Sequence, residues 1–134
     1  MPTNSDLKTN FDSQYQLGDP EMDTTHKAFI ELCTKTEAAS GAEFQSLFSE
    51  LFEHTKTHFA DEEARMQASN FSAYGEHRAD HQRILGDMER FNQRVQAGRL
   101  PMAKAWLGDS LPAWFDLHAK TMDSALAAHI KQSE

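Results

Sequence analysis

Apolar residues recur every three or four positions through most of this chain, which is the spacing of one buried face of an α-helix. The first such run contains Met22, His26, Phe29, Ile30, Cys33 and Glu37. It predicts a helix that Asp23 or Thr24 caps and that ends near Gly41, since glycine readily takes the left-handed conformation that closes a helix. The same spacing predicts three further helices, at about 42–68, 76–96 and 102–130.

Two parts of the chain depart from this pattern. Residues 1–10 are polar, and we expect them to be flexible, whereas residues 11–21 carry the aromatic Phe11 and Tyr15 and are predicted to form an arm on the body of the domain. In the last helix, Pro112 lies in the interior, where proline removes a hydrogen bond and collides with the carbonyl four residues back. We therefore expect either a kink between Gly108 and Pro112 or a helix restart that Ser110 caps.

The predicted elements define the fold class. The sequence shows no strand-like alternation, and short loops join the predicted helices. A chain of 134 residues is long enough to bury one core. We therefore predict a single all-α domain over residues 1–134, an antiparallel up-down-up-down four-helix bundle with an N-terminal arm.

Charge and composition exclude several kinds of partner. The net charge is -8 and no run of Lys or Arg forms a stripe, so nucleic acid and anionic membranes are not expected partners. No apolar run approaches the roughly 20 residues of a membrane span, and the first residues lack the apolar segment of a signal peptide. The single cysteine, Cys33, cannot form an internal disulfide. We expect a cytoplasmic protein and treat it as a monomer.

Polar residues with ligand chemistry lie on the apolar stripes. His58 and Glu62 are four positions apart on the second predicted helix, so their Cβ atoms are about 5–6 Å apart on one face. Four positions beside this stripe are expected to face solvent: Asp61, Glu63, Arg65 and Gln67. The full set of candidate metal ligands is His26, His58, Glu62, His77, His81, His118 and Asp123.

Five imidazoles and two carboxylates in an apolar bundle need compensation, because an unpaired buried carboxylate costs much free energy. Metal ions supply it. Imidazole suits iron, zinc or copper, and carboxylates can bridge two metals, so this donor set suits two iron ions. The Glu-x-x-His motifs of ferritin-like di-iron proteins do not occur in the sequence.

At these positions the sequence resembles the hemerythrins, and specifically the single-domain bacterial hemerythrins. The resemblance covers nearly the whole chain from Phe11, and its motifs are residues 22–26, 58–63, 77–81 and 114–118, with Asp123 after them. It implies two irons with a bridging oxo or hydroxo group. It also implies that three histidines hold one iron and two hold the other: His77, His81 and His118, then His26 and His58.

By the same resemblance, Glu62 and Asp123 bridge the irons, and dioxygen binds at the iron with two histidines. His118 and Asp123 are five residues apart, about 140° around an α-helix, which fits a carboxylate that reaches sideways to bridge. The expected oxygen pocket is apolar and consists of Phe29, Phe59, Phe115, Ala119 and Met122.

Some positions differ from the usual family pattern. Phe115 and Ala119 stand where members usually have leucine and isoleucine, and His54 stands where tyrosine is common in bacterial members. His54 and Trp114 each lie one helical turn before a candidate ligand and are possible outer-shell residues. Two function classes stay open at this point: reversible dioxygen binding for storage, delivery or sensing, and a redox enzyme such as a peroxidase or oxidase at the same centre.

Overall fold

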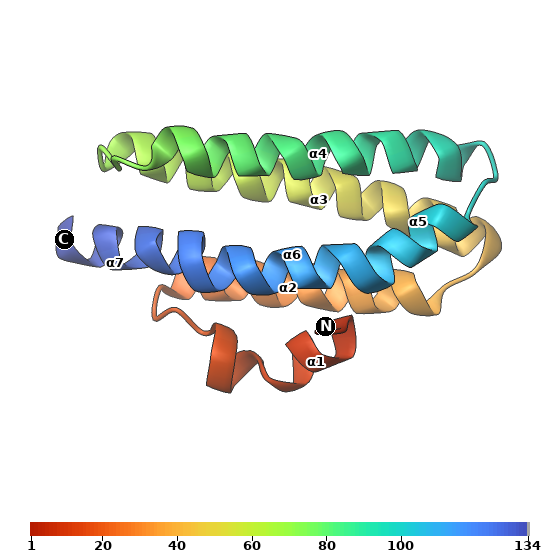
Figure 1. Ribbon diagram of the computed structural model, residues 1–134, viewed down its shortest axis with the longest axis horizontal. Helices are drawn as coiled ribbons and strands as arrows, with labels where there is room; N and C mark the ends of the chain where they lie inside the picture. The colour runs from red at the N-terminus through yellow and green to blue at the C-terminus, as the bar shows by residue number, and fades with distance from the viewer. Residues whose placement is uncertain (134) are drawn as a thin grey trace.

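The computed structural model describes residues 1–133 and shows an all-α bundle (Figure 1). Four long helical stretches run in alternating directions: α2 (Pro20–Ala38), α3 (Gly41–Ala68), α4 (Tyr74–Gln96) and a segmented fourth stretch from Pro101 to Ser133. The predicted up-down-up-down topology is confirmed. Within residues 1–133 there is no strand, and none of the helices combines the length and hydropathy that crossing a membrane requires.

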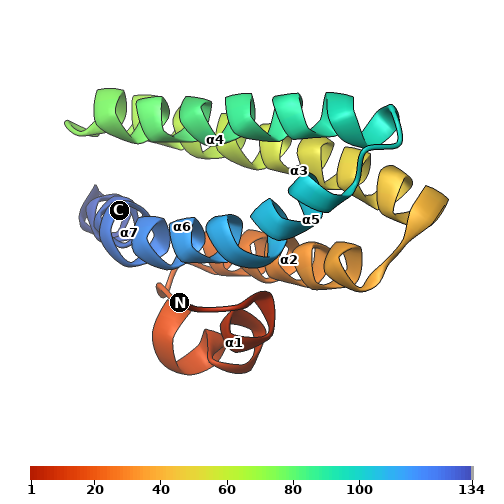
Figure 2. The same ribbon diagram turned by 45° about the vertical axis from the view of Figure 1, so that its right-hand side comes forward.

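The fourth stretch alternates α-helical and π-helical turns. Its elements are α5 (Pro101–Ala105), η2 (Trp106–Ser110), α6 (Leu111–His118), η3 (Ala119–Asp123) and α7 (Ser124–Ser133). The chain bends between α5 and α6, as Figure 2 shows, so the kink predicted near Pro112 is confirmed. The cap predicted at Ser110 is wrong: its side chain makes no capping hydrogen bond in the described chain, and its backbone stays helical. The wider π-turn η2 lets the helix continue into Pro112 without a restart.

The prediction that residues 1–10 are loose is also wrong. Helix α1 (Asn4–Thr9) forms there, and Leu7 is buried against the bundle. Thr3 and Asp6 make a capping box: the Thr3 N–H donates to Asp6 Oδ2 (2.9 Å), and the Thr3 hydroxyl accepts from the Asp6 N–H (3.1 Å). One apolar residue in a polar segment gave too little periodicity to predict this helix.

The arm predicted over residues 11–21 does lie on the bundle. The π-helical turn η1 (Phe11–Tyr15) buries both of its aromatic side chains. Asn4 of α1 fastens the arm further, since its amide donates to the Leu107 carbonyl (3.0 Å) and to Glu37 Oε1 (3.1 Å). Glu37, which the sequence pattern placed on the inner face of α2, is exposed.

The start of α2 differs from the prediction. The helix begins at Pro20, so Asp23 and Thr24 lie inside it and do not cap it. The carboxylate of Asp23 instead accepts hydrogen bonds from the backbone N–H groups of Leu17 (2.8 Å) and Gly18 (3.1 Å), which closes the loop before the helix. Gly41 has the predicted left-handed conformation (φ 55°), but it begins α3, whereas α2 ends three residues earlier at Ala38.

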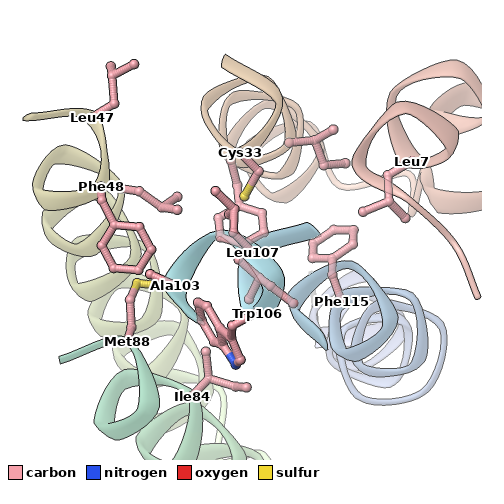
Figure 3. Close-up of a cluster of buried hydrophobic side chains, with 14 of the residues drawn as sticks. Leu7, Cys33, Leu47, Phe48, Ile84, Met88, Ala103, Trp106, Leu107 and Phe115 are labelled. Carbon is pink, nitrogen blue, oxygen red and sulfur yellow. The ribbon is translucent and has the colours of Figure 1, made fainter. Parts of the chain in front are cut away.

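The apolar core is divided. The larger cluster fills the end of the bundle where Phe48, Met88, Trp106 and Leu107 meet, and Leu7 points into it from α1 (Figure 3). A smaller cluster at the other end contains Met22, Met66, Leu126 and Ala127. Along α2, α3 and the fourth stretch, the candidate ligands lie between residues of these two clusters. The polar centre is therefore closed by apolar side chains at both ends.

Candidate metal centre

The four long stretches bring all seven candidate ligands to one place. The contributors are His26 from α2, His58 and Glu62 from α3, His77 and His81 from α4, and His118 and Asp123 from the fourth stretch. All seven side chains are buried. Each lies on the inner stripe of its helix, so the apolar packing that assembles the bundle also assembles the cluster.

The donor atoms form two groups within residues 1–133, and in each group they lie within 4.8 Å of one another. The first group, called the three-histidine group below, is Glu62, His77, His81, His118 and Asp123. The second, the two-histidine group, is His26, His58 and Glu62. Glu62 belongs to both groups and therefore connects them.

The two oxygens of Glu62 face different groups. Oε2 lies 2.6 Å from His58 Nε2 and 3.5 Å from His26 Nε2. Oε1 lies 3.4 Å from His77 Nε2 and 3.3 Å from His81 Nε2. The carboxylate thus spans the two groups of histidines.

Asp123 is placed in the same way. Its Oδ1 lies 3.0 Å from the Nε2 atoms of both His77 and His118, and its Oδ2 lies 3.1 Å from His26 Nε2. Each of the two buried carboxylates therefore presents one oxygen to the three-histidine group and the other to the two-histidine group, an arrangement that can bridge two cations.

A π-turn places Asp123. The 140° offset calculated from the sequence is wrong here because residues 119–123 form η3, and π-helical hydrogen bonds join residues five apart. His118 and Asp123 therefore follow each other on one face of the helix, and His118 Nε2 approaches Asp123 Oδ1 to 3.0 Å. The carboxylate reaches the centre along the helix and not sideways.

Many polar atoms of the cluster lack hydrogen bonds. Throughout the described chain, every buried side-chain nitrogen or oxygen without a hydrogen-bond partner belongs to one of the seven candidate ligands or to His54. The unpaired atoms include the Nε2 atoms of His26, His77, His81 and His118, with Glu62 Oε1 and Asp123 Oδ1. Each such atom costs about 1–3 kcal/mol if nothing satisfies it. Convergent imidazole nitrogens and carboxylate oxygens fit metal ions, which satisfy these atoms together.

The charges in the cluster also favour a cation. Burial lowers the pKa of His26, but the carboxylates of Asp123 and Glu62 raise it more, to about 10. For His118, burial lowers the pKa, whereas Asp123 and Asp80 bring it up to about 9. Burial raises the pKa of Glu62, but His58 and His26 hold it well below its usual value. The buried negative charge of the carboxylates therefore favours cations at the centre, either protons on His26 and His118 or metal ions in their place.

Two acidic residues outside the predicted set contact the ligands. Glu63 Oε2 accepts a hydrogen bond from His81 Nδ1 (3.0 Å), and Asp80 Oδ2 accepts one from His118 Nδ1 (2.8 Å). Glu63 was predicted to be solvated, and so was Arg65, which is half-buried in an ion pair with Asp19. Both predictions are wrong. Each side chain reaches a neighbouring element, which the periodicity of its own helix cannot reveal.

The predicted pocket residues do not all lie on one side. The ring of Phe115 meets His26 edge-on (centroids 5.2 Å apart) and stacks on Phe29, whose centroid is 6.1 Å from that of His58. Ala119 is fully buried in the same apolar cluster. These three residues lie in the cluster that closes the centre at the end of the larger core.

Phe59 and Met122 are placed differently. Phe59 lies parallel to the ring of His81, with centroids 3.8 Å apart, and is 5.2 Å from His58. Met122 is half-buried and lines a surface cavity of about 270 Å³ together with His77. Phe59 therefore contacts both groups of histidines, whereas Met122 lies beside the three-histidine group.

The two candidate outer-shell residues differ in their contacts. The indole of Trp114 stacks on His118 (4.6 Å, 22°) and donates from Nε1 to Asp80 Oδ2 (2.9 Å). The ring of His54 stands edge-on to His58 (6.3 Å, 62°), and its buried Nε2 has no hydrogen-bond partner among residues 1–133. Trp114 thus shares a carboxylate with a candidate ligand, and His54 contacts His58 only through its ring.

Comparison with known proteins gives one family. The family model for the hemerythrin HHE cation binding domain matches residues 17–134. The bacteriohemerythrin of Ralstonia nicotianae is 33% identical over 116 residues, which cover 87% of this chain and 84% of that protein. The myohemerythrin of Sipunculus nudus is 32% identical over 112 residues, covering 81% of this chain and 79% of that protein. No solved structure matches the chain significantly.

Proposed function

The chain belongs to the hemerythrin family, and from this we propose that it binds dioxygen reversibly at a non-heme di-iron centre, for oxygen storage, delivery or sensing. We propose that residues 1–134 make up one hemerythrin-like domain. The observation that carries the function is the set of unpaired buried atoms: with the exception of His54 Nε2, all those in the described chain belong to the two groups of convergent donors. A function without bound metal would leave the free-energy cost of these unpaired buried atoms unexplained.

We assign the ligands by the two groups. His77, His81 and His118 would hold one iron, and His26 and His58 the other, with Glu62 and Asp123 bridging. The oxygens of both carboxylates support this assignment, because each presents one oxygen to each group of histidines. We further propose an oxo or hydroxo group as the third bridge, as the family resemblance implies.

Bound iron supplies the electrons on which reversible dioxygen binding depends. The two-histidine group offers one imidazole fewer, so we place dioxygen on that side of the centre. Here Phe29 and Phe115 pack against His26 and His58, and Phe115 is 1% exposed, so these two rings keep water from the face of the imidazoles that they cover. Trp114 and Phe59 cover imidazole rings of the three-histidine group and hold their orientation.

A peroxidase or oxidase at the same centre is the alternative, and no feature of residues 1–133 specifically favours it. The curated relatives carry the names bacteriohemerythrin and myohemerythrin. We propose a cytoplasmic monomer, the compartment being inferred from the buried free thiol of Cys33.

The test combines metal analysis with visible absorption. The purified protein is expected to carry two irons per chain, and its anaerobically reduced form to gain a visible band in air that disappears again when oxygen is removed. One zinc and no iron at full occupancy would overturn the assignment of the centre. Irreversible oxidation on first exposure to air would overturn reversible binding.

A further inference from the structure

The five candidate histidine ligands differ in what their Nδ1 atoms contact. Those of His81 and His118 donate to carboxylates, Glu63 at 3.0 Å and Asp80 at 2.8 Å. The Nδ1 atoms of His26, His58 and His77 are buried and have no hydrogen-bond partner in the part of the chain that the structure describes. Both carboxylate-bonded histidines therefore belong to the three-histidine group.

The two outer carboxylates are themselves held in place. Asp80 also accepts from Trp114 Nε1 (2.9 Å) and from Arg83 Nη2 (3.1 Å). Glu63 Oε1 lies 3.6 Å from Arg78 Nε. The hydrogen bond from His118 lowers the pKa of Asp80, burial opposes it, and Trp114 and Arg83 lower it further. Only 18% of the Asp80 side chain and 20% of the Glu63 side chain are exposed, so solvent screens these contacts only in part.

A carboxylate that accepts from Nδ1 changes what the imidazole offers at Nε2. The proton is fixed on Nδ1, so the Nε2 lone pair is free for a metal, and the neighbouring negative charge makes that nitrogen a stronger donor. It also orients the ring before any metal arrives. The two-histidine group has no such carboxylate among residues 1–133 and has one imidazole fewer.

We propose that Glu63 and Asp80 are positioning residues that make the three-histidine position the tighter of two metal positions, so that it fills first and empties last. This inference rests on the proposed two-metal centre. It adds an order of loading and names two side chains outside the ligand set that establish it.

Titration of the metal-free protein with Co²⁺ tests the loading order. Absorption of the bound ion is expected to develop in two separate steps, one equivalent in each. Glu63→Gln and Asp80→Asn keep the shape and remove the charge, and each is expected to weaken the first step by about tenfold, with losses of about 10- to 100-fold for the alanine variants. The affinity of the second step is expected to change little in these variants.

The chain offers matched controls. Asp87→Asn removes a carboxylate from the same helix as Asp80, and Asp87 likewise pairs with an arginine three residues later, Arg90. Glu53→Gln does the same on α3, where Glu53 pairs with Lys56. Neither carboxylate bonds to a histidine, so both controls are expected to titrate like the parent.

A nuclear magnetic resonance measurement separates positioning from general stability. In the protein loaded with diamagnetic Zn²⁺, the Nδ1–H protons of His81 and His118 are expected at low field because carboxylates accept from them. Glu63→Gln should move the His81 signal alone, and Asp80→Asn the His118 signal alone. A general loss of stability would move both signals in both variants.

The outcomes separate the two proposals. If two metals bind in one step in the parent, or if the variants weaken both steps equally, the loading order is overturned and the two-metal centre stands. If the metal-free parent binds neither Co²⁺ nor iron, the proposed function itself fails. A variant that does not fold leaves the decision to the parent's titration and its own Nδ1–H signals.

Discussion

Two regions of the bundle bury different kinds of side chain between the same helices: the larger apolar cluster, called the apolar region below, and the ligand centre, called the polar region. Around Phe48, Met88 and Leu107 the contacts are apolar, and each fully buried side chain of this size stabilises the fold by roughly 1.5–3 kcal/mol. Around Glu62 and Asp123, buried polar atoms without partners oppose folding. The apolar region therefore stabilises the fold by itself, whereas the proposed metal ions would offset the cost of the polar region.

Metal removal should have the largest effect on this contrast. Without metal the polar region keeps its unpaired groups. A ligand present at a thousand times its Kd stabilises the folded state by about 4 kcal/mol, and we expect the free energy of unfolding to fall by about this amount when the metal is removed. Amide hydrogen exchange should accelerate around His58, His77 and His118 and change little around Phe48 and Met88. Equal acceleration of exchange in both regions would contradict the idea that only the polar region depends on metal.

Leu107→Ala tests the apolar region. Leu107 is fully buried, so the cavity is expected to cost roughly 2–5 kcal/mol in the free energy of unfolding. The metal content of the folded variant should equal that of the parent. Leu117→Ala is the control, because Leu117 is 67% exposed and its loss should cost less than about 0.5 kcal/mol. A fall in metal content with Leu107→Ala would show that the apolar and polar regions are coupled.

Glu62→Gln and Asp123→Asn test whether these two carboxylates bridge the metal ions of the polar region. Each keeps the shape of the side chain but removes a negative charge between two cations, so elemental analysis should show a fall from two irons per chain towards one. The neighbouring Asp61→Asn serves as control, since Asp61 is exposed. The bridging assignment fails if both ligand variants keep full iron and reversible oxygen binding.

The smallest effect is expected where the two regions meet. Phe115→Leu replaces the ring that covers His26 with a smaller side chain, so the oxygen-bound form should decay several-fold faster. The decay is measured through the visible absorption of that form. Phe44→Leu removes the same kind of ring in the apolar region, where Phe44 is fully buried and its ring is tilted against that of Phe48 (centroids 5.8 Å apart). It should lower stability to a similar extent and leave the lifetime unchanged. Equal lifetimes in both variants would show that Phe115 does not protect the bound oxygen.

The sequence was sufficient where each helix determines its own buried face. Periodicity located the long helices, and the same stripes carried the ligand candidates from His26 to His118. It was insufficient where a contact depends on another element. Helix α1 depends on a cap and on one apolar residue that packs against the bundle, and Glu63 reaches a histidine on the next helix.

The π-turns were missed for a related reason. A hydrogen bond from i to i+5 replaces a good α-helical bond only where packing or a ligand rewards it, and no residue type marks the position. His118 and Asp123 were both assigned to the centre from the sequence, but their five-residue interval was interpreted with regular α-helical geometry, so η3 was missed.

The hydrogen bond from Asn4 to the Leu107 carbonyl joins residues 103 positions apart in the chain. Contacts between consecutive helices of the bundle close much shorter loops, which form quickly because loop-closure entropy grows with the separation of the contacting residues. Helix α1 also contacts α2, where Asn4 donates to Glu37, but the Leu107 carbonyl is in place only once the fourth stretch has packed. Helix α1 therefore completes its native contacts only after the fourth stretch has reached its place in the bundle.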